Sequence, residues 1–590
     1  MKMKRTIAAA AILMAACSAV RADVFDKAPA DAILAIKVAN LDQTNSKIAK
    51  LATDLGVAQF DPRMNDPLSA FLTQANMTQG VNRKGDFGII FLPPAEGAEF
   101  DEQSIIMLVP TSDAKAFLAN FGEATPVEGA MQVTTPEGET LNIADWNGYA
   151  AISQNLALLK APAATLKLTG TSATEAAKQD FLMYANFSKL SPKLMGEVEK
   201  GLAQTLKEIE EADGEKMDPK YKPLARAGVT QVFGIAKTFL RDSNGGTVGA
   251  TLTPAGLNFS AVGDFKPDSY LGKFASSVKE NSGSLITGLP DTKYLFFGGS
   301  SFESPVIAQT INETLEPVVA ELSKIEGVEQ AKQLASTFQT ALKATKGSVF
   351  GMPAPQAIGT DAVAQQIQII RGGGQSYRTA FEQAGQFAKT FIGDLDQGDD
   401  APKPTFTITP KAKTIDGVVF DQWDLDAPLP QDDPAAAQTE MMMNLMYGEK
   451  GLNYLYAPIG DDDFIVATSA SDAALTSFIK AYKTGDKSVA ARPHVKAVAE
   501  QLPKARIYEA YIALDEIVNT GVAVAQQQGM AVPITLPPDL APIGVSFGAE
   551  KTAMRFDAHL PQSTLRDFVA VGMQFFMQMQ GGGGGDAGGM

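Results

Sequence analysis

Ser546 is the first residue whose surroundings suggest chemistry, because it stands in Gly544-Val545-Ser546-Phe547-Gly548. This is the G-x-S-x-G spacing of a nucleophile elbow, in which a strained strand-to-helix turn lifts a serine above a sheet. The flanking residues instead favour a strand that continues through Ala549 into a hairpin, and the next histidine, His559, follows 13 residues later with no separate segment to carry it. We therefore expect Ser546 to be a strand residue and not a nucleophile.

A second serine motif, Ser477-Phe478-Ile479-Lys480, is followed closely by Lys483-Thr484-Gly485. Penicillin-binding enzymes use similar motifs, but from separate elements that face one pocket. Here only Ala481 and Tyr482 lie between the two, which places both on one helix and its end. The spacing therefore favours an ordinary helix.

Three consecutive glycines, Gly372, Gly373 and Gly374, join an expected strand to an expected helix. Glycine amides ahead of a helix N-terminus can cradle an anion. The segment lacks the Gly-Lys-Ser/Thr ending of a nucleotide loop. A plain connector is the favoured interpretation, and a site for a sulfate- or phosphate-sized anion is the alternative.

Metal ligands are scarce in this chain. Its two histidines, His494 and His559, are far apart in sequence, and its one cysteine, Cys17, lies near the N-terminus. A zinc site of the usual kind is therefore not expected. The acidic runs 394–400 and 461–463 could supply oxygen ligands to calcium, but solvated loops are the favoured interpretation. We expect no metal and no cofactor.

The best candidates for ligand binding are methionines and phenylalanines in two expected helices. Methionine side chains adapt to irregular apolar ligands, although at helical spacing they more often belong to ordinary core. The residues that we expect to line an apolar groove are Met441, Met442, Met446, Phe575 and Phe576.

The N-terminus has the pattern of a secretory signal peptide over residues 1–22. Basic residues precede an apolar run from Ile7 to Ala16, and Val20-Arg21-Ala22 offers a cleavage site. That run is about ten residues, half of what a membrane-spanning helix needs, and we expect no transmembrane segment. The alternative is lipidation at Cys17, which would anchor the chain to a membrane.

Charge excludes nucleic acid as a partner. The 590-residue chain has a net charge of −17, and loss of the leader, with its four basic residues, would make it −21. Such a surface repels nucleic acid and anionic lipid headgroups. At 45% hydrophobic residues, the chain can bury a large core in each of two domains without a disulfide.

After the predicted leader, the same sequence features occur twice in the same order, which indicates an internal duplication. Phe87 and Phe350 lie 263 residues apart in similar Phe-Gly strands, and Phe117 and Phe381 lie 264 apart in similar helices. Further pairs keep the same order, including a pairing of Thr230–Gly234 with Gly544–Gly548. We therefore expect a first repeat domain at 23–287, a second at 288–580, and a Gly-rich flexible tail at 581–590.

Alternating strands and amphipathic helices predict the α+β class: two similar domains from an internal duplication, each with mainly antiparallel sheet and packed helices. The layout resembles that of uncharacterised exported bacterial proteins with a duplicated domain of unknown function. It implies an exported protein of the periplasm or the extracellular space. We expect a non-enzymatic binding or interaction protein of the cell envelope, whose partner is an envelope protein or a small apolar ligand. The alternatives are an envelope-polymer hydrolase that uses acidic residues and a structural envelope component.

Overall fold

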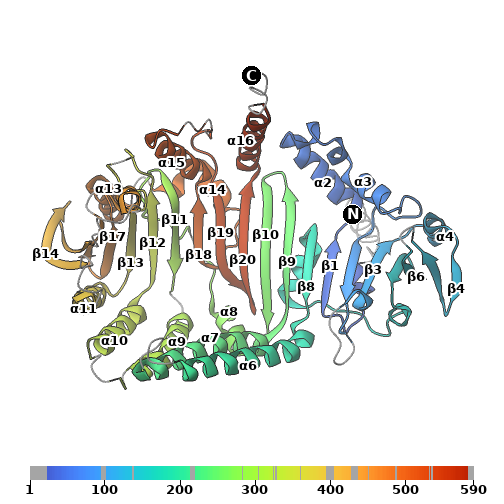
Figure 1. The fold of residues 1–590 in the computed structure, drawn as a ribbon, viewed down its shortest axis with the longest axis horizontal. Coiled ribbons are helices and arrows are strands. Elements are labelled where there is room, and N and C mark those ends of the chain that lie inside the picture. Colours follow the sequence, from blue (N-terminus) through green and yellow to red (C-terminus); the bar gives the residue numbers. More distant parts are fainter. Residues whose placement is uncertain are drawn as a thin grey trace, which may run out of the picture. The chain divides into compact units, whose positions relative to one another are not determined.

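The fold is known from a computed structural model (Figure 1). It describes residues 23–94, 101–135, 138–212, 219–281, 283–302, 305–322, 324–325, 329–358, 360–393, 404–426, 436–448, 451–485, 488–530, 532, 534 and 536–581. The predicted leader with Cys17, the acidic run 394–400 and nearly all of the Gly-rich tail lie outside these residues.

The chain forms two compact units that are not continuous in sequence. Unit 1 comprises Met1–Pro192, Ser243–Thr253 and Phe259–Asp264, of which the described part begins at Asp23; unit 2 comprises Lys193–Asp242, Pro254–Asn258 and Phe265–Met590.

Unit 1 has a sheet with the strand order β4-β5-β6-β7-β3-β2-β1-β8-β9-β10, in which the described registers are antiparallel. Most of β10 belongs to this unit. Its strands are β1 Leu34–Val38, β2 Phe87–Phe91, β3 Ile105–Pro110, β4 Thr125–Val127, β5 Ala130–Thr134, β6 Thr140–Asp145, β7 Tyr149–Ser153, β8 Phe181–Ala185, β9 Ser243–Thr253 and β10 Gly256–Phe265.

Unit 2 has the order β14-β15-β16-β17-β13-β12-β11-β18-β19-β20, again antiparallel. Matching β1 to β11, β2 to β12 and so on gives the same strand order in both units. The strands are β11 Tyr294–Ser301, β12 Gly347–Pro353, β13 Gln366–Arg371, β14 Thr405–Ile415, β15 Val418–Asp426, β16 Leu452–Ile459, β17 Asp463–Thr468, β18 Arg506–Ile512, β19 Ile543–Glu550 and β20 Ala553–Pro561.

The helices of unit 1 are α2 Leu41–Asp54, α3 Pro67–Gln74, α4 Ala114–Leu118 and α5 Gly170–Lys178. Helix α6 begins in unit 1 and continues in unit 2. From there the helices are α6 Phe187–Glu211, α7 Lys222–Asp242, α8 Tyr270–Ser277, α9 Pro305–Leu322, α10 Glu329–Ala344, α11 Gly374–Gly393, α12 Ala436–Tyr447, α13 Asp472–Thr484, α14 Pro493–Ala499, α15 Leu514–Gln527 and α16 Gln562–Gly581.

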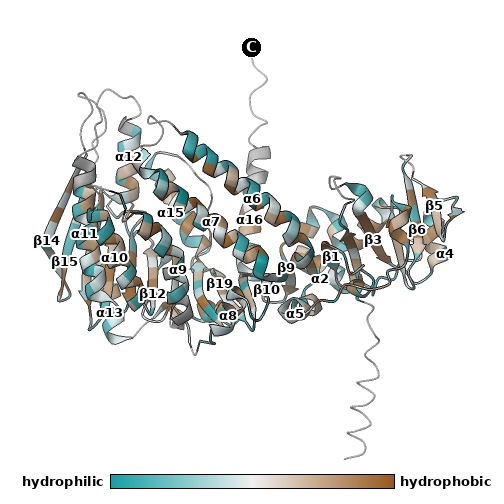
Figure 2. Ribbon diagram, turned by 90° about the horizontal axis from the view of Figure 1, so that it is seen from below, coloured by the Kyte–Doolittle hydropathy of each residue, from teal (hydrophilic) through white to brown (hydrophobic). Residues whose placement is uncertain are grey.

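Helices cover the unit 2 sheet unequally. On one face, which we call the packed face, α13 and α14 bury Phe478, Val495 and Val498 against β11, β12 and β18. On the other face, α11 packs Tyr377 against Phe464 over β13 and β17. Figure 2 shows α8 and α13 on one side of the strands and α11 and α15 on the other. Helix packing therefore concentrates the second-face core at one end of the strand order.

Unit 1 also has a core on each face of its sheet. One core joins Val24 and Phe25 to Ile90 and Tyr184, and the other joins Leu68 and Phe117 to strands β3, β6 and β7. The α+β class with mainly antiparallel sheet is thus confirmed. Among the described residues, no helix combines the length and the apolar character that a membrane span requires.

One expected element is wrong. The pairing of Thr230–Gly234 with Gly544–Gly548 treats both as strands, but Thr230–Gly234 lies inside helix α7, and only Gly544–Gly548 is in a strand, β19. The strand that occupies the place of β19 in unit 1 is β9. A run as short as Val-Phe-Gly fits the periodicity of a strand as well as that of a helix. Its helical conformation follows from the surrounding sequence, which forms the 21-residue helix α7.

The burial of the two histidines predicts that the stability of the folded protein depends on pH. Burial lowers the pKa of His559 and of His494 below the usual 6.5, and His559 Nδ1 lies 2.6 Å from Asn258 Oδ1. The unfolded chain then binds protons first, so this contribution is complete above pH 6.5 and is lost as the pH falls through the folded pKa values. We expect the urea midpoint to fall between pH 7 and pH 5.5, and to fall less in the H494Q/H559Q double variant. An equal fall in both proteins would assign the effect to other groups.

Candidate functional site

The candidate site is the part of the unit 2 sheet that no described helix covers. Directly paired residues of antiparallel strands share a face. The register places Ser300 beside Tyr508, Tyr508 beside Phe547 and Phe547 beside Phe556. These side chains therefore form one row across β11, β18, β19 and β20, on the face opposite to α13 and α14.

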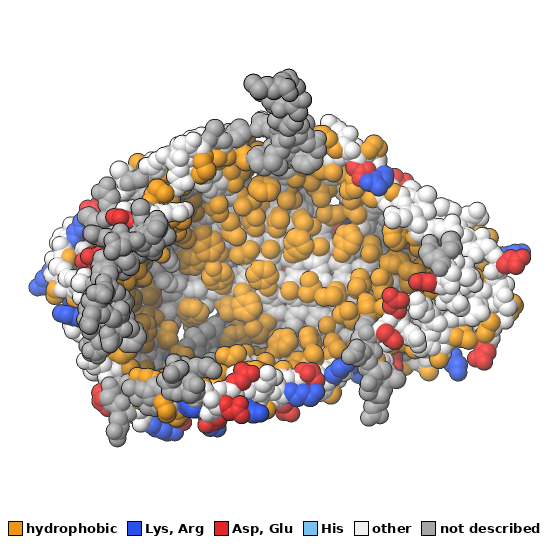
Figure 3. Space-filling view, viewed as in Figure 1, with side chains coloured by type: hydrophobic (Ala, Val, Ile, Leu, Met, Phe, Trp, Pro, Cys, Tyr) orange, Lys and Arg blue, Asp and Glu red, His pale blue; other side chains and the backbone are white. Residues whose placement is uncertain are grey.

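We call the surface built on this row the open face. It extends over β11, β12, β18, β19 and β20, and Figure 3 shows apolar side chains gathered in a hollow over these strands. None of its residues is charged. Its larger side chains are partly or largely exposed: Phe296, Phe350, Met352, Tyr508, Ile512, Ile543, Val545, Phe547, Met554 and Phe556.

The alternation along these strands is the reverse of the usual pattern. A half-covered antiparallel sheet normally turns its apolar residues toward the helices and its polar residues toward water. Here the packed face of β18 to β20 carries polar or charged residues with 7% exposure or less, namely Glu509, Ser546, Asp557 and His559. Phe556, on the open face, is 47% exposed. The large apolar side chains of these strands therefore lie on the face that no described helix covers.

Close helix packing explains the small residues on the packed face. A Cβ added to Gly544 would lie 2.4 Å from Val498 Cγ1 of α14. A Cβ on Gly548 would lie 2.1 Å from the carbonyl oxygen of Ala505. Large side chains have no room there, so β19 carries them on the open face.

Helices of unit 2 add further exposed apolar side chains. On α7, Val232, Ile235 and Phe239 fall at the spacing of one helix face and are 67%, 57% and 37% exposed. Ile517 of α15 and Phe568 of α16 are 41% and 49% exposed. Exposed apolar residues are normal when single, but a contiguous set marks a binding surface.

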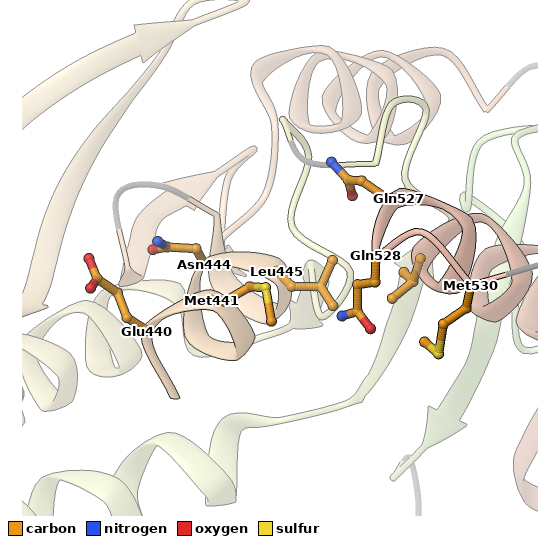
Figure 4. Close-up of a pocket in the computed structure, with 8 residues that line it drawn as sticks. Glu440, Met441, Asn444, Leu445, Gln527, Gln528 and Met530 are labelled. Carbon is orange, nitrogen blue, oxygen red and sulfur yellow. The ribbon is translucent and has the colours of Figure 1, made fainter. Parts of the chain in front are cut away.

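A separate groove of about 710 Å³ lies between α12 and α15. Met441 and Leu445 of α12 lie across it from Gln528 and Met530, at the C-terminal end of α15, and Glu440 and Asn444 point away from α15 (Figure 4). Helix α12 is held at its end by amide hydrogen bonds from residues 363 and 364 to the carbonyl oxygens of Leu445 and Met446. The groove is mainly apolar, with amide groups and the carboxylate of Glu440 at its margin.

The predicted groove residues meet different outcomes. Met441 lines the groove, while Met442 is 47% exposed and Met446 is partly exposed on the same helix. Phe575 and Phe576 belong to α16, but their side chains lie outside the described part. The groove pairs α12 with α15, and the expected pairing of α12 with α16 stays a prediction.

The glycine connector is occupied by the chain itself. The Gly372 amide donates to Asp463 Oδ1 at 2.9 Å, and the Gly374 amide donates to the Asp462 carbonyl oxygen at 2.8 Å. An anion at Gly372, Gly373 and Gly374 would therefore compete with a carboxylate. The anion site stays a prediction, and the Asp463 carboxylate would compete with an anion for the Gly372 amide.

Most buried carboxylates in the described residues form ion pairs, while Asp264 and Asp515 accept hydrogen bonds from backbone amides. Glu509, fully buried, lies 2.5 Å from Arg506, and Asp557 lies 2.7 Å from Arg555. In unit 1, Lys37 lies 3.3 Å from Asp23 and 3.8 Å from Asp86. A general acid needs a carboxyl group that can hold a proton, and a neighbouring cation disfavours that state. No cluster of potential metal ligands occurs among the described residues.

The open face is the feature that sequence reasoning missed. The signal was available in β19, where Val545 and Phe547 alternate with Gly544, Ser546 and Gly548. That pattern states which residues share a face. It does not state which face the helices will cover.

The open face predicts a contrast in stability between two phenylalanines. Phe556→Ser on the open face removes a side chain that is already 47% exposed and should lower the free energy of unfolding by about 1–1.5 kcal/mol. Phe478→Ala, in the packed core, should cost about 3–5 kcal/mol. Urea unfolding of both variants measures this. A large loss in Phe556→Ser would mean that this side chain is core.

Comparison with known proteins assigns no family. No protein-family model matches this chain, and no curated protein matches it. Among solved structures, one titled "Structure of crystal form III of TP0453" aligns at 8% identity over 50% of this chain and 100% of that chain. Its TM-score of 0.21 is too low to carry an argument about fold or function.

Proposed function

We propose that this protein binds an apolar ligand of the lipid class on the open face of unit 2. The observation that carries the proposal is the reversed alternation of β18 to β20, which leaves Phe547 and Phe556 exposed while Glu509 and Ser546 are buried.

The free energy available on this surface is large. Fully burying an exposed phenylalanine, methionine or valine is worth about 1.5–3 kcal/mol, and a side chain that is already partly buried contributes a fraction of this value. The five strands are spaced about 4.8 Å apart, so the open face is about 19 Å wide. An occupant that covers most of these side chains together would overcome the entropy lost on binding.

The chemistry of the surface favours a hydrocarbon ligand over a protein. Protein interfaces carry a polar rim and about one hydrogen bond per 100–200 Å². The open face has no charge, and two of its few hydroxyl groups, those of Ser300 and Ser348, already bond each other at 3.0 Å. Hydrocarbon chains need no hydrogen bonds. The net charge of −17 further disfavours anionic headgroups.

We also infer that the two units arose by internal duplication. The shared order of ten strands supports this, and so does the single bridge before each first strand, Pro29 with Thr165 and Pro290 with Ser488. Duplication supplies a reason why unit 1 also exposes apolar side chains on β8, β9 and β10, at Met183, Val248 and Phe259.

We further infer that the protein acts outside the cytoplasm, after removal of residues 1–22. Cleavage after Ala22 would keep Val24 and Phe25, which are buried in a core of unit 1. A lipid-binding protein in this location would carry its ligand through the periplasm or the extracellular medium.

The test uses the mature protein, stripped of bound lipid, and N-phenyl-1-naphthylamine, a dye that fluoresces in apolar surroundings. We expect saturable binding that a neutral acylglycerol displaces. The F350S/F547S double variant should bind at least tenfold more weakly, because it places two hydroxyl groups in the centre of the open face.

Phe60→Ser is the matched control, since Phe60 is 60% exposed and belongs to unit 1. It should bind as the unaltered protein does. Equal dye binding by the unaltered protein, F350S/F547S and Phe60→Ser would overturn the proposal. Failure of the acylglycerol to displace the dye would overturn it as well. Native mass spectrometry of protein from its own source then identifies the ligand as an adduct lost on denaturation.

A further inference from the structure

The open face carries one hydroxyl group that no described residue satisfies. We propose that the Tyr508 hydroxyl is the polar anchor for the ligand, and that it hydrogen-bonds an uncharged oxygen group such as the carbonyl of a fatty-acyl ester. This inference rests on the proposed function and names the ligand class more narrowly.

The position of Tyr508 is central and rigid. It lies on β18 between Ser300 of β11 and Phe547 of β19. Its ring stacks on that of Phe350, with centroids 6.0 Å apart and planes inclined by 18°. Neighbours on both sides therefore hold the ring, and the side chain is partly exposed on the open face.

Four tyrosines of unit 2 have hydrogen-bond partners for their hydroxyl groups within the chain, whereas the buried hydroxyl of Tyr511 has none among the described residues. Tyr294 donates to the carbonyl oxygen of Pro290 at 2.9 Å, and Tyr482 donates to Asp463 Oδ2 at 2.9 Å. Tyr377 and Tyr456 bond side chains of other residues at 2.8 and 3.1 Å. Among the described residues, the Tyr508 hydroxyl has no such partner. This hydroxyl is open to water in the uncovered sheet. A hydrocarbon that covered it would remove that water at a cost of about 1–3 kcal/mol, and an acceptor on the ligand would offset the cost.

The protonation state of Tyr508 defines what it can bind. Burial raises the pKa of Tyr508 above its usual value near 10, so the phenol stays protonated and can donate. The open face offers no lysine or arginine to a carboxylate or phosphate, and an unpaired anion there would be costly. An ester carbonyl accepts a hydrogen bond without carrying a charge, so it fits both conditions.

The experiment compares two displacing ligands of equal chain length, hexadecane and methyl hexadecanoate, in the dye assay on the mature protein. The difference in hydrophobicity between the ester and the alkane predicts a ratio of their affinities. We expect the ester to bind threefold to tenfold more tightly than this ratio predicts. Tyr508→Phe removes one oxygen atom and keeps the stacked ring, so it should lose this preference while binding hexadecane as before.

Tyr454→Phe, on β16 of the same unit, is the matched control and should keep the ester preference. An unchanged preference in Tyr508→Phe would overturn the anchor while leaving the proposed function intact. Binding of neither ligand by the unaltered protein would overturn the proposed function itself. Tighter binding of hexadecanoate than of its methyl ester at pH 8 would also overturn the ester assignment, because it would require a cation that the open face lacks.

Discussion

The distribution of side-chain volume between the two faces of the unit 2 sheet is the constraint on which the rest of the structure depends. Helix α14 approaches β19 so closely that Gly544 has no room for a side chain. Bulky residues of that strand must then lie on the other face. Because the described helices cover only one end of that face, the bulky side chains on β18, β19 and β20 stay accessible, and the open face follows from the packing.

This arrangement buries polar and charged residues on the packed face, and their desolvation is unfavourable. Fully buried Glu509 is compensated by Arg506 and by the amide of Ile286, which donates to it at 3.2 Å. Buried ion pairs seldom add stability over an apolar core of equal volume. Their presence beneath an apolar surface is the opposite of what folding alone would favour, which is why the open face is better explained by a ligand than by stability.

The two apolar features of unit 2 differ in chemistry. The groove between α12 and α15 is margined by amides and includes the adaptable side chains of Met441 and Met530. The open face is wider and rests on aromatic side chains held in strands, which fix its shape. An aromatic surface with one hydroxyl group that has no partner among the described residues suits recognition of a particular group within a hydrocarbon, whereas methionines suit ligands of variable shape.

The sequence by itself determined the α+β class, most strands of both sheets and their periodicity, because alternation and helical spacing are local properties of the chain. It did not resolve whether Thr230–Gly234 was strand or helix, since five residues satisfy both periods. Above all, it could state that Phe547 and Ser546 lie on opposite faces, but not which one is buried. That depends on where α13, α14 and α11 pack, and packing between residues distant in sequence is decided only in the tertiary structure.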